Sequence, residues 1–144
     1  MDVKVKKLKA NAIIPTKGSV ESAGCDLYAC LDEKVEIPAG KNIKIGTGLA
    51  IAVPSGYFGA IFARSGLATK KGLRPANCVG VGDSDYRGEY IVALYNDSDT
   101  THVIEPGERI AQLILVPYGN VTFQEVDSLD DTERGSGGFG STGA

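Results

Sequence analysis

The sequence predicts an all-β fold, either a closed barrel or a double-sheet sandwich. Short segments in which apolar and polar residues alternate follow one another along the chain, and Pro and Gly residues separate them. Turns that recur roughly every 8–12 residues are typical of barrels and sandwiches, whereas βαβ units need long helical segments between strands. With 144 residues the chain has the size of one ordinary domain, so we expect a single hydrophobic core.

The strand prediction rests on alternation with a period of two. It is clearest over residues 43–53, whose odd-numbered positions share one face of an extended chain: Ile43, Ile45, Thr47, Leu49, Ile51 and Val53. Similar patterns predict strands at residues 3–8, 35–37, 57–63, 89–95, 109–116 and 121–126. Only residues 66–71 are predicted to form a helical turn.

Reverse turns are predicted where Pro and Gly lie close together. Pro presets the first central position of a turn, and Gly takes the positive φ that other residues avoid. The chain has such pairs at positions 15 and 18, 38 and 40, 54 and 56, 106 and 107, and 117 and 119. These turns mark the ends of the predicted strands.

Composition and charge argue against several functional classes. The hydrophobic share of 42% is near the average for soluble proteins, and no apolar run approaches the ~20 residues that a membrane-spanning helix needs. The formal net charge is −3, so the chain as a whole does not attract a nucleic-acid backbone. We therefore expect neither a membrane nor a nucleic acid as a partner.

The first residues and the cysteines indicate a reduced, cytoplasmic setting. Residues 1–9 carry several lysines but lead into no apolar segment of the kind that a secretory signal needs. Cys25, Cys30 and Cys78 form no C-x-x-C pair, and an odd number suits neither a disulfide framework nor a tetrahedral zinc site. We interpret Cys25 and Cys30 as ordinary small buried side chains rather than metal ligands.

The last residues differ in character from the rest. An acidic stretch at residues 130–133 leads into a glycine-rich stretch at 134–143, in which Phe139 is the only large apolar side chain. Such a segment cannot build a core. The sequence therefore divides into a β-domain at residues 1–129 and a flexible segment at 130–144, which is either a disordered tail or an arm that orders on a ligand or a neighbouring subunit.

The glycine-rich stretch is a candidate phosphate-binding segment. Its backbone N–H groups can converge on phosphate oxygens, with Arg134, Ser141 and Thr142 as further donors. It is not a Walker A loop, because Ser141 stands where the lysine belongs and the chain ends before a helix can follow.

A second candidate phosphate-binding segment follows a predicted strand. Arg64, Ser65 and Gly66 offer a guanidinium group, a hydroxyl group and an uncrowded backbone N–H in consecutive positions. Nucleophilic attack by Ser65 would require a base beside it. The only histidine, His102, stands alone near a Pro-Gly turn, so a Ser-His triad is not expected.

Acidic residues mark two further segments. Residues 80–90 are predicted to form a hairpin that turns between Asp83 and Gly88, where a carboxylate can serve either as a general base or as a structural Asx-turn residue. Asp26 lies among small residues, and Gln112 lies near the start of a predicted strand together with Arg109. Each of these signals is weak alone.

Taken together and in this order, the five segments resemble the five signature motifs of the trimeric dUTPase family. The match runs from residue 23 to residue 143. The most specific segments are Ala-Arg-Ser-Gly, Gly-x-x-Asp-x-Asp-Tyr-Arg-Gly and Arg-Gly-x-x-Gly-Phe-Gly-Ser-Thr-Gly. The resemblance implies a jelly-roll-like β-fold, a homotrimer with active sites at subunit interfaces, a C-terminal arm that closes over a neighbour's site, and Mg²⁺-dependent hydrolysis of dUTP to dUMP and pyrophosphate.

The resemblance also implies roles for residues. Asp83 would activate a water molecule for attack on the α-phosphorus, and Asp26 would hold Mg²⁺ through water. The other implied contacts are Arg64, Ser65, Gly66 and Gln112 with phosphates, Tyr86 with the deoxyribose, Asn77 and Phe139 with uracil, and Arg134, Gly140, Ser141 and Thr142 in the closing arm. The implied role is to keep uracil out of DNA and to supply dUMP for thymidylate synthesis.

One position departs from the family pattern. At Gly82, directly before the implied base, the family usually carries an aliphatic residue such as Ile, so we expect a looser hairpin and reduced turnover. Two alternative functions are a dCTP deaminase of the same fold and a nucleotide-binding regulatory trimer. Ammonia release from dCTP distinguishes the first, and a cellular phenotype that persists in Asp83→Asn distinguishes the second.

Overall fold

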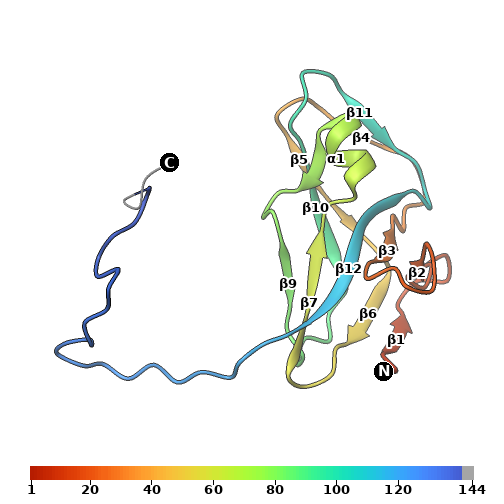
Figure 1. Cartoon of the computed structure of the whole chain (residues 1–144). Coiled ribbons are helices and arrows are strands. Elements are labelled where there is room, and N and C mark those ends of the chain that lie inside the picture. The colour runs from red at the N-terminus through yellow and green to blue at the C-terminus, as the bar shows by residue number, and fades with distance from the viewer. Residues whose placement is uncertain (141–144) are drawn as a thin grey trace.

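Over the residues that the structure describes, the chain folds into antiparallel β-strands with one short helix, as predicted (Figure 1). The computed structural model describes residues 1–140. The elements are β1 (Lys4–Lys7), β2 (Thr16–Lys17), β3 (Cys25–Tyr28), β4 (Val35–Ile37), β5 (Asn42–Gly46), β6 (Leu49–Ala52), β7 (Tyr57–Phe62), α1 (Ser65–Lys71), β8 (Leu73–Pro75), β9 (Gly80–Gly82), β10 (Ile91–Asn96), β11 (His102–Ile104) and β12 (Arg109–Pro117).

The largest sheet has five strands in the order β2-β3-β12-β7-β9, with the long strand β12 at its centre and β9 at one edge. A three-stranded sheet has the order β5-β10-β8, and the pairs β1-β6 and β11-β4 complete the body. All of these pairings are antiparallel. Strands far apart in sequence lie side by side, which agrees with the predicted all-β fold.

The core is one cluster of mainly aliphatic side chains, as expected for a single domain. Several of its members have 0% exposure and come from different strands: Leu27, Ile37, Ile45, Leu94 and Ile104. The helix α1 contributes Leu67 at 6% exposure. The sheets therefore share one interior, and the candidate site residues lie around it.

The strand predicted at residues 43–53 is in fact two strands. β5 ends at Gly46, β6 begins at Leu49, and Gly48 between them has a φ of +68°. β5 pairs with β10 whereas β6 pairs with β1, so the chain changes sheets at this bend. The Thr47 hydroxyl donates to the backbone oxygen of Tyr90 at 2.7 Å and anchors the bend. The apolar alternation continues through it, so the pattern alone could not locate it.

The strand predicted at residues 121–126 is wrong. In the described part of the chain no strand follows β12, and Val121 and Phe123 are 67% and 94% exposed. A strand needs a second backbone with which to exchange hydrogen bonds. Figure 1 shows the chain leaving the body after β12, away from any such partner.

The predicted helical turn at residues 66–71 is confirmed as α1. It ends at Gly72, which has a φ of +65° and whose N–H donates to the Ala68 oxygen at 3.1 Å. A left-handed glycine is a common helix C-cap. No helix in residues 1–140 is long and apolar enough to cross a membrane.

The predicted turn glycines are confirmed in part. Gly40, Gly56 and Gly107 have positive φ angles, but Gly18 and Gly119 do not. The strands β2, β3, β8 and β11 were missed, and each has only two to four residues, over which alternation is a weak signal. The hairpin predicted at residues 80–90 is not a paired one, because β9 pairs with β7 whereas β10 pairs with β5 and β8.

Candidate active site

The first group of predicted site residues lies where β3, β12 and β7 run side by side. Gln112 of β12 is the register partner of Asp26 on β3 and of Phe62 on β7. Residues directly opposite one another in a sheet project their side chains from the same face. The topology therefore brings Asp26, Gln112 and the segment that follows Phe62 together.

Asp26 is the centre of an ion-pair network. Its Oδ1 accepts a hydrogen bond from Arg64 Nε at 2.8 Å, and its Oδ2 accepts one from Arg109 Nη1 at 3.2 Å. The side chain of Asp26 is 15% exposed, and those of Arg64 and Arg109 are 25% and 51% exposed. Charge-assisted contacts of this kind are directional, so Arg64 has a defined place beside Asp26. We refer to Asp26, Arg64, Arg109 and Gln112 as the cationic corner.

Arg109 was not predicted as a site residue. The available signal was a positive charge three residues before Gln112 on the same strand. The structure adds what the pattern lacked, because the antiparallel pairing of β12 with β3 brings Arg109 to the Asp26 carboxylate.

Gln112 is held by its amide group. Its Nε2 donates to the backbone oxygen of Ala63 at 2.8 Å. Gly24 leaves room for this side chain, since a Cβ at position 24 would lie 3.1 Å from the Gln112 Cδ and closer still to its Oε1.

Ser65 and Gly66 are the first residues of α1, directly after Arg64. Both are in exposed or partly exposed positions, and the space beside Gly66 is open. The first N–H groups of a helix have no intrahelical acceptor. The backbone at this point can therefore donate to an anion next to the cationic corner.

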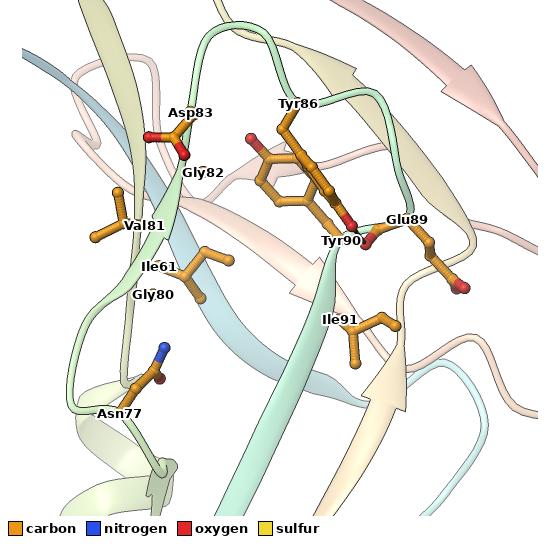
Figure 2. Close-up of a pocket in the computed structure, with 10 residues that line it drawn as sticks. All are labelled: Ile61, Asn77, Gly80, Val81, Gly82, Asp83, Tyr86, Glu89, Tyr90 and Ile91. Atoms are coloured by element: carbon orange, nitrogen blue, oxygen red, sulfur yellow. Dashed lines mark hydrogen bonds between the residues drawn. The ribbon is translucent and has the colours of Figure 1, made fainter.

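The second group surrounds a pocket of about 230 Å³. Three predicted residues line it, and Figure 2 shows them around β9: Asn77 before the strand, Asp83 directly after it, and Tyr86 in the following turn. The rest of the lining is Ile61, Gly80, Val81, Gly82, Glu89, Tyr90 and Ile91. Neither Asp26 nor Arg64 nor Gln112 is part of it, so one chain presents two separate groups of site residues.

The space that a side chain at Gly82 would take is filled by Tyr90. A Cβ at position 82 would lie 2.8 Å from Cζ of Tyr90 and closer still to its hydroxyl oxygen, so Tyr90 occupies the volume of the missing side chain. Tyr90 is only 2% exposed. Burial raises the pKa of the Tyr90 phenol above its ordinary value, and the nearby Asp83 carboxylate adds to this shift. Tyr90 therefore replaces packing that the absent side chain at Gly82 would have supplied, and the looser hairpin and the reduced turnover both stay predictions.

The third group belongs to the C-terminal segment. Arg134, Phe139 and Gly140 follow the exposed chain after β12, and Phe139 is fully exposed. The hydrogen bonds of this segment in the described residues are local, such as Gly137 N–H to the Arg134 oxygen at 3.1 Å. Ser141 and Thr142 lie outside the described residues. Up to residue 140, the segment forms no hydrogen bond or ion pair with either of the other groups of the same chain.

Comparisons with known proteins agree with this arrangement. The dUTPase family model matches residues 10–143. The deoxyuridine 5'-triphosphate nucleotidohydrolase of Desulfitobacterium hafniense is 50% identical over 140 residues, which are 96% of this chain and 92% of the relative. That of Syntrophotalea carbinolica is 43% identical over 141 residues, which are 98% of this chain and 96% of the relative.

A solved structure supports the same conclusion. The dUTPase of Staphylococcus bacteriophage 80alpha with dUPNHPP has a TM-score of 0.90 at 29% identity, with 99% of both chains covered. Fold and comparisons together define a nucleotide-hydrolysing β-protein. The chain belongs to the dUTPase family, and the prediction of a dUTP-hydrolysing enzyme is confirmed.

Proposed function

We propose that the chain splits dUTP into dUMP and pyrophosphate as a homotrimer, with Asp83 as the general base. The observation that carries the proposal is the position of Asp83, at the end of β9 on a pocket that Asn77 and Tyr86 also line. A carboxylate beside a small pocket can activate water next to a bound nucleotide. The product dUMP serves thymidylate synthesis, and removal of dUTP keeps uracil out of DNA.

The reaction is a displacement at phosphorus. Asp83 accepts a proton from a water molecule, the water oxygen bonds to the α-phosphorus, and the bond from the α-phosphorus to the oxygen of pyrophosphate breaks. Negative charge develops on the phosphoryl oxygens and is stabilised by positively charged groups. No covalent intermediate on a side chain is required.

The cationic corner supplies positively charged and polar groups for the triphosphate. Arg64 can form paired hydrogen bonds with phosphate oxygens, and Ser65, Gly66 and Gln112 add further donors. These residues already lie together on neighbouring strands and at the start of α1. Their arrangement before a ligand binds lowers the entropic cost of binding.

Asp26 fits a role in holding Mg²⁺. Magnesium is usually bound by one or two carboxylates, water molecules and substrate phosphates rather than by a complete protein cage. In residues 1–140 no group of three or more His, Cys, Asp or Glu side chains is placed to form such a cage. A single carboxylate that acts through water suits a metal held mainly by the triphosphate. When bound, Mg²⁺ neutralises charge on the triphosphate.

The pocket beside β9 selects the base and the sugar. Uracil presents an N3–H donor and an O4 acceptor, whereas cytosine presents the reverse, so a polar group such as the Asn77 amide discriminates between them when water is excluded. Tyr86 is 44% exposed and lies on the pocket, where its ring can pack against the deoxyribose and leave no room for a 2′-hydroxyl group.

The separation of the three groups within one chain supports an active site shared between copies. The cationic corner, the pocket and the C-terminal segment each carry part of the predicted constellation, and none is complete alone. In a homotrimer, the arm at residues 130–144 of one copy would close over a neighbour's site. Arg134 with Ser141 and Thr142 would then cover the phosphates, and Phe139 with Gly140 would cover uracil.

The test is pyrophosphate release in Mg²⁺ from dUTP, dCTP, dTTP and UTP in parallel, with Asp83→Asn as the matched control. We expect release from dUTP in strong preference to the others, and release that is lower by about 100-fold or more with the variant. Light scattering in the same buffer should give the mass of three chains. Ammonia release from dCTP would support the deaminase alternative, and turnover by a monomer would exclude the shared site.

A further inference from the structure

Tyr90 is a buried residue to which the proposed reaction gives no role. It is one of the largest fully buried side chains, and its hydroxyl is the one buried side-chain polar atom in the described residues that has no hydrogen-bond partner. A buried hydroxyl without a partner is unfavourable. A phenol at this position therefore needs a reason other than its own hydrogen bonding.

The hydroxyl end of Tyr90 lies over a pair of glycines. Gly59 of β7 and Gly82 of β9 are register partners at the edge of the five-stranded sheet. A Cβ at Gly59 would lie 3.1 Å from the Tyr90 hydroxyl oxygen, and a Cβ at Gly82 would lie 2.8 Å from its Cζ. Glycine weakens a strand, and an aromatic ring packed over it restores the lost contact. Tyr90 thus supports the edge strand β9, which ends at Gly82, directly before Asp83.

The same ring supports Tyr86. The two ring centroids are 5.9 Å apart, with an interplanar angle of 55°. The Tyr86 hydroxyl donates to the backbone oxygen of Glu89 at 2.9 Å, and Gly88 leaves space for the Tyr86 ring to cross the chain. Figure 2 shows Tyr90 behind Tyr86, with Gly82 and Asp83 beside both. The buried ring of Tyr90 therefore lies against Gly82, which precedes the proposed base Asp83, and against Tyr86, the ring that is proposed to face the sugar.

We propose that Tyr90 is a positioning residue that sets the distance between Asp83 and Tyr86, and through it the selectivity for deoxyribose over ribose. This inference rests on the proposed function, in which Asp83 is the base and Tyr86 faces the sugar. Tyr90 is not proposed to touch the substrate and acts only through Asp83 and Tyr86. Its ring is matched in size to the missing side chain at position 82, so the two positions are coupled.

The coupling predicts what happens when the large side chain is moved from position 90 to position 82. Tyr90→Val removes the ring from beneath Gly82 and Tyr86, and Gly82→Ile introduces a side chain where the ring lies. Each single change should lower the ratio of kcat/KM for dUTP to that for UTP by about tenfold, since a displacement of ~1 Å in an active site changes rates by up to roughly 100-fold. The double variant should recover most of the ratio, because the new Ile fills the space that the ring leaves.

Two further variants separate positioning from stability. Tyr90→Phe keeps the ring and should keep the dUTP-to-UTP ratio. Ile37→Ala empties part of the core at β4, which belongs to another sheet, and should lower the melting temperature without changing the ratio. The ratio compares two substrates in one preparation, so it does not depend on how much enzyme is folded. If Tyr90→Val cannot be purified, Gly82→Ala provides a smaller displacement of the same ring.

An unchanged ratio in Tyr90→Val and in Gly82→Ala would overturn the proposal and leave Tyr90 as a packing residue. Loss of the ratio in Tyr90→Phe would also overturn it, because the hydroxyl rather than the ring would then be responsible. The proposed function has its own readout. Normal turnover by Asp83→Asn would remove the assigned base whatever the Tyr90 variants do.

Discussion

Arg64 donates a hydrogen bond from Nε to Oδ1 of Asp26 at 2.8 Å, which links the proposed phosphate-binding residue to the proposed metal-binding residue. The contact uses Nε, and the two Nη groups carry most of the guanidinium N–H donors. The ion pair therefore orients Arg64 and still leaves donors for phosphate. The same contact fixes the Asp26 carboxylate next to the proposed phosphate-binding site, where a metal ion bound to the triphosphate would lie.

The first prediction concerns Asp26. Asp26→Asn keeps the shape but removes the charge that orients Arg64 and attracts Mg²⁺, so the Mg²⁺ concentration for half-maximal turnover should rise by roughly 10- to 100-fold. Titration of Mg²⁺ in the pyrophosphate assay measures this. Arg109→Gln is the control, because it removes the weaker partner at 3.2 Å and keeps the carboxylate. Equal Mg²⁺ dependence in wild type and Asp26→Asn would exclude the metal role.

The second prediction concerns Asp83. Asp83→Asn removes a base that acts mainly in the transition state, so turnover should fall by about 100- to 10,000-fold while nucleotide binding stays largely intact. Calorimetric titration with a non-hydrolysable dUTP analogue measures binding apart from turnover. A variant that neither binds nor hydrolyses would show that Asp83 holds the pocket together. A cellular phenotype that persists in an inactive, binding-competent variant would favour a regulatory role.

The fold class and the single core could be predicted because both follow from patterns that can be read along the sequence, namely apolar alternation and Pro-Gly turns. Alternation and Pro-Gly turns located β7, β10 and β12, which are long enough to show a period. The bend at Gly48 was not predicted, because the chain changes pairing partners there while its apolar positions continue to alternate. The exposed residues 121–126 show the opposite case, since a strand-like pattern does not form a strand without a partner.

The site was predicted as a set of residues but not as an arrangement. The motifs named Asp26, Gln112 and Asp83, yet only the pairing of β3, β12 and β7 shows that the first two lie together and apart from the pocket of the third. The absence of a side chain at Gly82 looked like lost packing. Only the fold shows that Tyr90, eight residues later, fills that space.

The third prediction concerns the C-terminal segment. Truncation after Asp131 removes residues 132–144, and those of them that the structure describes, 132–140, take no part in the core cluster, so the melting temperature should change little. Turnover should fall strongly, because an arm that excludes water and completes the site would be lost. Thermal unfolding and the pyrophosphate assay on the same preparation measure the two effects. A truncated chain that does not fold would place the segment in the folding unit, and one with full activity would remove the arm from the reaction.

The last prediction concerns alkaline stability. Burial raises the pKa of Tyr90 above its ordinary value of 10.0, with a further contribution from Asp83. The folded protein therefore holds this proton more tightly than the unfolded chain does. The resulting stabilisation is fully present below the unfolded pKa and is lost as pH rises from about 10 through the folded pKa. Tyr90→Phe cannot ionise here, so its free energy of unfolding should fall less over this range.

Denaturant unfolding between pH 8 and pH 11 measures the difference, with Tyr118→Phe as the control because Tyr118 is 48% exposed. Burial also raises the pKa of the Cys30 thiol, but wild type and both variants share that contribution, and it cancels in the comparison. At neutral pH, Tyr90→Phe should be as stable as wild type or slightly more so, since it removes a buried hydroxyl that has no partner. A clear loss of stability at neutral pH would show that the hydroxyl has a partner, such as a buried water molecule, and that the unpaired phenol is not the native arrangement.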